Sequence, residues 1–275
     1  MTLIFASDLD KTLIYSKNSM DEIVPEEELI PVEENGGAYT SFMTKRAITQ
    51  LSEIAKSAFI VPVTTRTITQ YKRVFYFNKD LNLRYAITSN GGNILIDGSP
   101  DEEWSALVQS ALRMSADHLE VKAMYDQISS PEWALRGWLC DGLFYTMIID
   151  PKKTPFERLD QFRETIHPMG WVLSVQGRKV YLVPARVTKG EAMLHLSKRL
   201  GSKFIAASGD SLLDASLLAI ADYAIAPGHG ELFGKSSSGF MYQFTQKTGI
   251  RASEEILERV HRELQHYLAQ NSSAS

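Results

Sequence analysis

The sequence has little cysteine, no long apolar run and no excess of basic residues. Its single cysteine, Cys140, excludes an internal disulfide and a cysteine-rich zinc site. The apolar runs Leu3–Ala6 and Ile60–Val63 are far shorter than the roughly 20 residues that span a bilayer, and acidic residues from Asp8 onward interrupt any signal peptide. The 29 Lys and Arg against 33 Asp and Glu give a net charge of −4, which disfavours nucleic acid as a partner. We therefore expect a cytoplasmic protein without membrane or nucleic-acid partners.

The composition is that of an ordinary globular protein. Apolar residues make up 44% of the chain and charged residues 23%, which disfavours global disorder and coiled coil. A length of 275 residues allows one large domain or two smaller ones. A chain of this size can bury a core without disulfides.

Short apolar runs alternate with helical patterns in residues 1–96 and 186–275. Continuous apolar runs of this kind are typical of strands buried in a parallel sheet. The sequence therefore predicts an α/β fold with a Rossmann-like, doubly wound parallel sheet. Its strands are expected at 3–6, 59–63, 85–88, 204–207 and 223–226, and its helices at 44–57, 67–77, 189–200, 212–220 and from Ser253 onward.

Residues 97–185 follow a different pattern. A helix is predicted at 100–119, a hairpin at 133–150 around Asp141-Gly142, a second helix at 155–167 and a second hairpin at 171–183. This order, αββαββ, is typical of an α+β layer with a sheet on one side and helices on the other. We therefore expect a core of residues 1–96 and 186–275 that is split by an inserted domain of residues 97–185.

Two carboxylates follow the first predicted strand directly. Asp8 and Asp10 lie in the segment Ser7–Thr12, at the strand end where ligands bind in open α/β sheets. One carboxylate there can act as a nucleophile and the other can transfer a proton, while a divalent cation would relieve their repulsion. An Asx turn at a strand end produces the same short pattern, so the pair alone does not settle its role.

Three more polar segments lie at predicted strand ends or helix starts. Asp210 and Asp214 are four residues apart, which places them on one face of a helix start, where acids also act as ordinary caps. In Thr64–Arg66 a hydroxyl can bind a phosphate oxygen, and Lys189 opens a helix against the preference of the helix dipole. Together with the first pair, these segments predict one common site at the carboxyl edge of the sheet.

These segments resemble the motifs of the haloacid dehalogenase superfamily, in particular the Cof-type and sucrose-phosphatase-like group with a type 2 cap. The resemblance covers nearly the whole chain and implies a catalytic core at 1–96 and 186–275 with a cap domain at 97–185. The matching segments are Asp8–Thr12, Thr64–Arg66, Lys189-Gly190 and Gly209–Asp214, together with Ser89–Gly92 before the insertion and Tyr181–Pro184 at its end.

The resemblance implies a catalytic role for four residues. Asp8 would be the nucleophile that forms an aspartyl-phosphate. Asp10 would be the general acid for the leaving alcohol and then the base for water. Thr64 and Lys189 would hold the phosphoryl oxygens, in keeping with the charge neutralisation that phosphoryl transfer requires.

The resemblance also implies a Mg²⁺ cofactor and a phosphate-binding set. The metal would be held by Asp8, by Asp210 and by the backbone carbonyl of Asp10, with Asp214 close behind the ion. The implied substrate-binding residues are Thr64, Thr65, Arg66, Asn90, Lys189 and Arg178.

The sequence departs from the family pattern at three places. Thr65 replaces the usual glycine of the second motif, and Leu213 lies where the fourth motif commonly has asparagine. A hairpin predicted at 29–42, around Asn35-Gly36-Gly37, is longer than this group usually carries. It is either a flap over the site or a surface ornament, and the tolerance of loops to insertion favours the ornament. The acidic residues 21–34 are likewise expected at the surface.

The predicted function is hydrolysis of a small phosphorylated metabolite, such as a sugar or polyol phosphate, with the cap selecting the substrate. For each candidate contact in the cap, a solvated surface position or a core position is the more common explanation. These candidates are Arg136, Arg178, Lys179, Trp133, Trp138 and Tyr181.

Two alternative functions remain open. One is a phosphomutase or another phosphotransferase that uses the same nucleophile. The other is a non-catalytic binding or regulatory module. The presence of the charged residues Asp8, Asp10, Lys189 and Asp210 argues against the module.

Overall fold

In the computed structural model, which describes residues 1–233 and 242–272, the chain divides into two units. The first unit comprises Met1–Pro100 and Lys189–Ser275, and the second comprises Asp101–Thr188. None of the described helices combines the length and apolar character needed to cross a bilayer.

The first unit is built on a five-stranded parallel sheet in the order β14-β13-β12-β1-β4. Its strands are β1 (Thr2–Ser7), β4 (Phe59–Pro62), β12 (Ser202–Ser208), β13 (Tyr223–Ala226) and β14 (Gln243–Phe244). In β1, Leu3–Ala6 shows no polar alternation because both faces of the strand are buried. Pro62 ends the edge strand β4, where its missing N–H removes no bond from the sheet interior.

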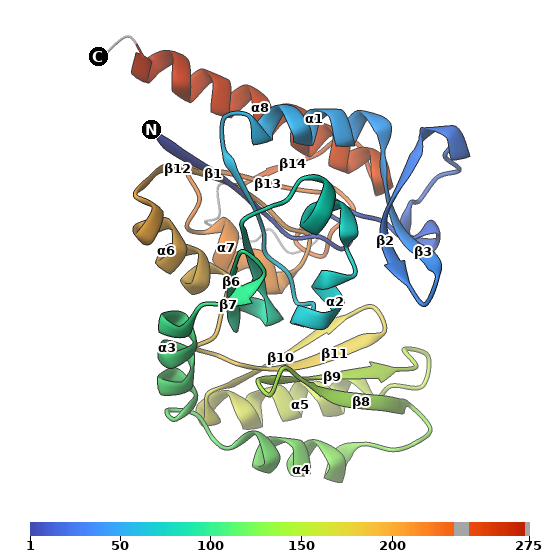
Figure 1. Ribbon diagram of the computed structural model, residues 1–275. Coiled ribbons are helices and arrows are strands. Elements are labelled where there is room, and N and C mark those ends of the chain that lie inside the picture. Colours follow the sequence, from blue (N-terminus) through green and yellow to red (C-terminus); the bar gives the residue numbers. More distant parts are fainter. Residues whose placement is uncertain (234–241, 273–275) are drawn as a thin grey trace. The chain divides into compact units, whose positions relative to one another are not determined.

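Helices cover both faces of this sheet (Figure 1). The helices α1 (Lys45–Ala55) and α8 (Gly249–Ser272) lie side by side on one face, and α6 (Lys189–Leu200) and α7 (Ala215–Leu218) lie on the other. Apolar residues at helical spacing explain the contact of α1 and α8 with β1. They are Ala47, Leu51, Ile54, Ile256, Leu257, Val260 and Leu264, which share one core with Leu3 and Phe5.

Three predicted helix boundaries in this unit are wrong. The helix α8 begins at Gly249, and Ser253, expected at its start, instead donates its hydroxyl to the carbonyl of Ile250 at 2.7 Å. The segment 67–77 forms a short helix, α2 (Ile68–Lys72), and then a π-helical turn, η3 (Tyr76–Asp80). The segment 212–220 opens with the turn η6 (Leu212–Asp214) before α7.

Smaller elements complete the first unit. An antiparallel sheet of β5 (Tyr85–Thr88), β6 (Asn93–Ile96) and β7 (Ser99–Pro100) adjoins the end of β4 through a parallel bridge between Val63 and Ile87. The predicted hairpin is present as β2 (Leu29–Asn35) and β3 (Ala38–Thr44). Its turn residues are Gly36 and Gly37, both at positive φ. Short helical turns are η1 (Lys17–Ser19), η2 (Glu26–Glu28) and η4 (Ser89–Gly91).

The second unit is an antiparallel sheet in the order β10-β11-β9-β8 with helices on one face. Its elements are α3 (Glu102–Leu112), α4 (His118–Ile128), β8 (Ala134–Cys140), β9 (Phe144–Ile149), α5 (Phe156–Ile166), η5 (His167–Met169), β10 (Trp171–Gln176) and β11 (Lys179–Pro184). The helix expected at 100–119 is wrong at its end, because α3 stops at Leu112. A second helix, α4, was not predicted and begins at His118, where the Asp117 side chain caps it by accepting the Leu119 N–H at 2.7 Å. The order is therefore ααββαββ rather than αββαββ.

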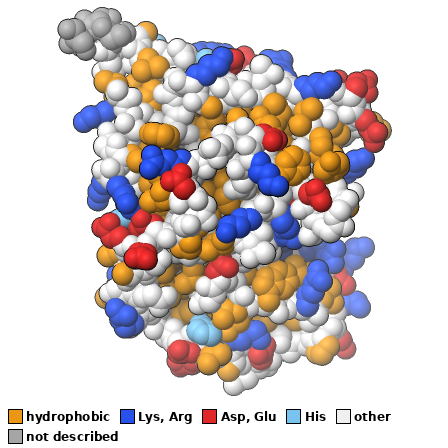
Figure 2. Space-filling view, viewed as in Figure 1, with side chains coloured by type: hydrophobic (Ala, Val, Ile, Leu, Met, Phe, Trp, Pro, Cys, Tyr) orange, Lys and Arg blue, Asp and Glu red, His pale blue; other side chains and the backbone are white. Residues whose placement is uncertain are grey.

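Charged side chains of both signs are mixed on the surface. Figure 2 shows Lys and Arg interspersed with Asp and Glu over much of the face that it draws. This distribution agrees with the small net charge of −4.

A close contact between α6 and α7 requires glycine at position 190. A Cβ on Gly190 would lie 2.3 Å from the carbonyl oxygen of Ser216. Alanine in a helix is ordinarily favoured over glycine by about 1 kcal/mol. Here we expect Gly190→Ala to destabilise the protein by about 1–3 kcal/mol, because the backbone of α7 must move. Urea denaturation measures the change.

The matched control is Lys198→Ala, at an exposed position of the same helix. It should change the stability by less than about 0.5 kcal/mol. Equal midpoints for the two variants would contradict the proposed clash.

Candidate active site

Asp8 is the first residue beyond β1 and lies buried at the carboxyl edge of the sheet. Its backbone N–H donates to the carbonyl of Ser208 at 2.9 Å, so the pairing of β1 with β12 extends to this residue. The carboxylate accepts a hydrogen bond from Lys189 Nζ at 2.6 Å on Oδ1 and one from Thr12 Oγ1 at 3.4 Å on Oδ2. Only 5% of Asp8 is exposed. The strand therefore fixes both the position and the direction of this carboxylate.

Lys189, the first residue of α6, is 1% exposed and lies between two carboxylates. Its ammonium group forms ion pairs with Asp8 and Asp214. Burial alone would lower the pKa of Lys189, but the two carboxylates outweigh burial and raise that pKa, so the lysine is charged. The same carboxylates offset the unfavourable position of a cation at a helix start.

Asp214 holds the loop that follows β12. Its Oδ2 accepts the N–H of Asp210 at 3.1 Å, the N–H of Ser211 at 2.9 Å and the hydroxyl of Ser211 at 2.8 Å. A Cβ at Gly209 would lie 2.4 Å from Cβ of Asp214, so this loop can close only around glycine. With Lys189 on its other oxygen, Asp214 orients its neighbours through both oxygens.

Three carboxylates gather at this point and could hold a metal ion. Asp8, Asp210 and Asp214 each offer an oxygen atom, and these atoms lie within 4.8 Å of one another. Burial raises the pKa of Asp8 to about 7, and burial together with Asp8 and Asp214 raises the pKa of Asp210 well above its usual value. Fully ionised, the three carboxylates and Lys189 carry a formal charge of 1 − 3 = −2. A divalent cation with a preference for oxygen ligands would balance this charge.

Asp10 lies on the same loop but faces a different partner. Its carboxylate accepts two hydrogen bonds from Arg66, from Nε at 2.8 Å and from Nη2 at 2.8 Å. The Asp10 side chain remains 49% exposed, whereas that of Arg66 is 12% exposed. The arrangement leaves a carboxylate that is accessible and held in one orientation.

The second predicted segment and Asn90 are joined by backbone bonds. Thr64 is fully buried, its hydroxyl accepts the N–H of Arg66 at 3.1 Å, and its carbonyl accepts the N–H of Asn90 at 3.0 Å. Asn90 adopts a left-handed conformation with φ of 58°. Thr65 does not have a positive φ, so the replacement of glycine by Thr65 carries no backbone strain.

The structure brings nine of the predicted site residues together in the first unit and places Arg178 and the other cap candidates in the second. Seven of the nine are Asp8, Asp10, Thr64, Arg66, Lys189, Asp210 and Asp214, and the other two, Thr65 and Asn90, adjoin Thr64. Arg178 lies exposed in the turn between β10 and β11 of the second unit. Trp133 is buried in the core of that unit, and Arg136 lies over Trp138 with 5.9 Å from Cζ to the ring centroid.

Two further residues lie at the site: Glu33, which was not predicted there, and His229, which follows a core strand and was expected at most at the edge of the site. Glu33, expected at the surface, is 5% exposed and pairs with Arg66, so the prediction for this residue was wrong. The sequence pattern did not indicate that Glu33 is buried, because irregular pairing at Glu33 breaks the alternation of buried and exposed side chains along β2. His229 accepts the N–H of Gly249 on Nδ1 at 3.1 Å and contacts the carbonyl of Lys11 through Nε2 at 3.0 Å. Burial lowers its pKa, so a neutral His229 ties the Asp8 loop to α8.

Comparison with known proteins identifies similar sequences and folds. The family model described as sucrose-6F-phosphate phosphohydrolase matches residues 1–229. No curated protein sequence matches the chain. The structure is similar to that of a sucrose-phosphatase from Synechocystis sp. PCC6803 in complex with sucrose and phosphate, with a TM-score of 0.67 and 16% identity over 94% of this chain and 98% of that chain.

Two further solved structures share the fold. A Thermoplasma acidophilum protein has a TM-score of 0.61 and 16% identity over 96% of this chain and 99% of that chain. A sugar phosphatase of HAD subclass IIB has a TM-score of 0.56 and 16% identity over 96% of this chain and 100% of that chain. The predicted superfamily and the predicted fold class are thereby confirmed.

The repulsion among the three carboxylates predicts how stability depends on pH. A folded-state pKa that is raised means that the folded protein binds more protons than the unfolded chain, so the metal-free protein loses stability as the pH rises towards 7 and above. We expect Asp210→Asn to raise the melting temperature in EDTA at pH 8 by about 2–4 °C, which corresponds to roughly 1 kcal/mol. The gain should shrink at pH 5. Scanning calorimetry at both pH values checks this.

A saturating divalent cation provides the control. It should stabilise the original protein more than Asp210→Asn, because the variant lacks one ligand. A variant that melts below the original protein in EDTA at pH 8 would contradict the repulsion.

Proposed function

The chain belongs to the sucrose-6F-phosphate phosphohydrolase family of phosphatases, and from this premise we propose that it hydrolyses a small sugar phosphate through phosphorylation of Asp8. The observation that carries the proposal is the buried Asp8 carboxylate, fixed by Lys189 and Asp214 at the edge of the sheet. The accessible carboxylate of Asp10, two residues later, supplies the second group that the reaction needs.

In the first step, a carboxylate oxygen of Asp8 attacks the phosphorus atom of the ester. The bond between phosphorus and the alcohol oxygen breaks, and the carboxyl proton of Asp10 passes to that oxygen. The positive charge of Lys189 lies 2.6 Å from Asp8, where it stabilises the negative charge of the transferring phosphoryl group. The products are the free alcohol and a phosphorylated Asp8.

In the second step, water attacks the phosphorus atom of the phosphorylated aspartate. Asp10, now a carboxylate, takes a proton from the water, and the bond between phosphorus and Asp8 breaks. Inorganic phosphate leaves, and Asp8 is regenerated. Arg66 holds Asp10 in one orientation for both transfers.

We propose Mg²⁺ as the cofactor, held by Asp8, Asp210 and the backbone carbonyl of Asp10. When bound, it neutralises charge on the phosphoryl oxygens. The donor set fits, because Mg²⁺ is bound by few carboxylates together with substrate oxygens and water. Oδ2 of Asp214 already accepts three hydrogen bonds and Oδ1 pairs with Lys189, so the role proposed for Asp214 is to orient Lys189 and the loop at Asp210.

The second unit, residues 101–188, is proposed to act as the cap that selects the substrate. The face of its sheet opposite α4 and α5 carries a row across four strands that contains hydroxyl and aromatic side chains. The row consists of Ser174, Tyr181, Thr146 and Trp138, each paired with the next. Aromatic faces with neighbouring hydroxyl groups are suited to a sugar, which offers both C–H faces and polar edges.

Hydrolysis of para-nitrophenyl phosphate tests the proposed mechanism. We expect turnover that requires Mg²⁺, stops in EDTA and falls by at least about 10³-fold in Asp8→Asn, because the amide cannot act as the nucleophile. Asp80→Asn, at an exposed position, is the matched control and should retain full activity. Release of phosphate is the measured quantity.

Two further measurements separate the alternatives. A phosphotransferase would transfer the phosphoryl group to an added alcohol in competition with water, which a panel of sugars and polyols detects. A protein that neither hydrolyses the ester nor binds beryllium fluoride would contradict the enzymatic proposal. A panel of sucrose 6-phosphate, glucose 6-phosphate and glycerol phosphate identifies the preferred class of substrate.

A further inference from the structure

We propose that Glu33, carried by the hairpin β2–β3, is a positioning residue that holds Arg66 and, through Arg66, the proton-transferring carboxylate of Asp10. This inference rests on the proposed function, because it assigns a partner to the general acid and base. Glu33 acts on Asp10 only through Arg66 and takes no part in the proton transfer itself.

The guanidinium of Arg66 joins the two carboxylates through two bidentate pairs. Nη1 donates to Oε1 of Glu33 at 2.6 Å and Nη2 donates to Oε2 at 3.1 Å. On its other side, the same guanidinium donates twice to Asp10, both times at 2.8 Å. Since a planar guanidinium offers its donors in a fixed fork, the position of Glu33 sets the plane in which Asp10 is held.

Burial increases from Asp10 towards Glu33. The exposed fraction of the side chain is 49% for Asp10, 12% for Arg66 and 6% for Glu33. Burial would raise the pKa of Glu33, but hydrogen bonds from Arg66 and from the Ser41 hydroxyl hold it below its usual value, so Glu33 is ionised. Glu33, the buried residue of the three, is therefore fixed, and Asp10, the exposed one, faces the site.

Two irregularities in the hairpin turn Glu33 inward. In a regular strand, neighbouring side chains point to opposite faces. Here Val32 and Glu33 are both buried, because the pairing of β2 with β3 shifts on each side of Glu33. The shift places Glu33 opposite Ser41, whose hydroxyl donates to the Glu33 carboxylate. Bulges of this kind redirect side chains next to active sites.

The hairpin is anchored to the segment that carries Asp10. Phe42 on β3 and Tyr15, five residues after Asp10, exchange two backbone hydrogen bonds of 2.8 and 3.0 Å. The N–H of Glu34 donates to the carbonyl of Arg73 at 3.1 Å, which ties β2 to the segment after α2. Glu33 is thus held against both the first and the second motif.

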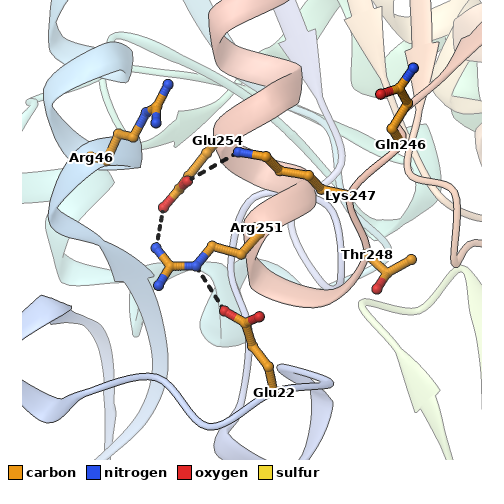
Figure 3. A pocket seen from close by; sticks show the side chains of 7 residues that line it. All are labelled: Glu22, Arg46, Gln246, Lys247, Thr248, Arg251 and Glu254. Atoms are coloured by element: carbon orange, nitrogen blue, oxygen red, sulfur yellow. Dashed lines mark hydrogen bonds and ion pairs between the residues drawn. The ribbon is translucent and has the colours of Figure 1, made fainter.

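Both ends of the hairpin are also tied to the start of α8. Thr44, at the end of β3, donates its hydroxyl to Glu254 at 2.8 Å. Arg251 pairs with Glu28, just before β2, and with Glu22 and Glu254, as Figure 3 shows for the last two. In the pocket that Figure 3 shows, Arg251 forms ion pairs with the carboxylates of Glu22 and Glu254. We therefore interpret this cluster as an anchor for the hairpin.

The chemistry of the leaving group distinguishes positioning from mere structure. A nitrophenolate leaves without a proton, whereas the alkoxide of a sugar needs one from Asp10. In Glu33→Gln, an amide replaces one carboxylate oxygen, so Arg66 loses an ionic partner and Asp10 loses its fixed orientation. The loss should therefore be greater for the sugar phosphate than for the aryl phosphate.

The experiment compares kcat/KM, which reports the step in which the alcohol leaves, for para-nitrophenyl phosphate and for a sugar phosphate that the original enzyme hydrolyses. We expect Glu33→Gln to lower kcat/KM about 10–100-fold for the sugar phosphate and within about threefold for the aryl phosphate. The matched control is Glu34→Gln, the same change at the next, exposed residue of β2, which should alter neither value.

Each outcome decides between the alternatives. Equal losses for both substrates, or no loss, would overturn the positioning role. If Glu33→Gln fails to fold, Ser41→Ala takes its place, because it removes one hydrogen bond to Glu33 and should produce a smaller loss with the same substrate preference. An original enzyme that hydrolyses neither ester would instead reject the proposed function.

Discussion

The repulsion among buried carboxylates is the constraint on which the rest of this site depends. Asp8 and Asp210 are brought together because β1 and β12 are neighbours in a parallel sheet and an acidic residue follows the end of each strand. One lysine, Lys189, is buried among them, and its position requires the helix α6 to start at this point. Gly190 allows that helix to approach α7, and Gly209 allows Asp214 to close the loop. Two glycines, one lysine and the strand order therefore support a single electrostatic arrangement that could hold a divalent cation.

The sequence allowed the site to be predicted where a residue follows an uninterrupted apolar run. Asp8, Thr64 and Asp210 each follow such a run, and parallel pairing brings the ends of neighbouring strands together. Glu33 could not be predicted in this way, because two shifts in the pairing of β2 with β3 bury it although it lies in an acidic segment. The boundary between α3 and α4 was missed because apolar periodicity continues across it, while the cap at Asp117 depends on one hydrogen bond. Local patterns thus indicated strands and helices, and tertiary contacts decided where they bend or end.

The hairpin β2–β3 connects the segment of the first motif with that of the second motif in the structure. In the sequence it is an acidic insertion between them. In the structure it contacts both, through the backbone of Tyr15 on one side and through Arg66 on the other. Arg66 is thereby shared by two carboxylates, and the one that faces the site is the more exposed. A hairpin inserted between two motifs can in this way hold a side chain of the site, here Asp10, in position through Arg66.

The pairing of β1 with β12 also governs the order in which this protein can assemble. Ser7 and Ser208 bond to each other across 201 residues of chain, so β1 waits for a partner strand that is synthesised much later. Until then, β4 is the one described neighbour of β1 in the sheet that has been made, and the apolar face formed by Leu3 and Phe5 can pack against α1 but not yet against α8. Asp8 is therefore synthesised long before Lys189, its ion-pair partner in the site. The first unit therefore depends on contacts between residues far apart in the chain, and the inserted unit is synthesised before the unit that contains it is complete.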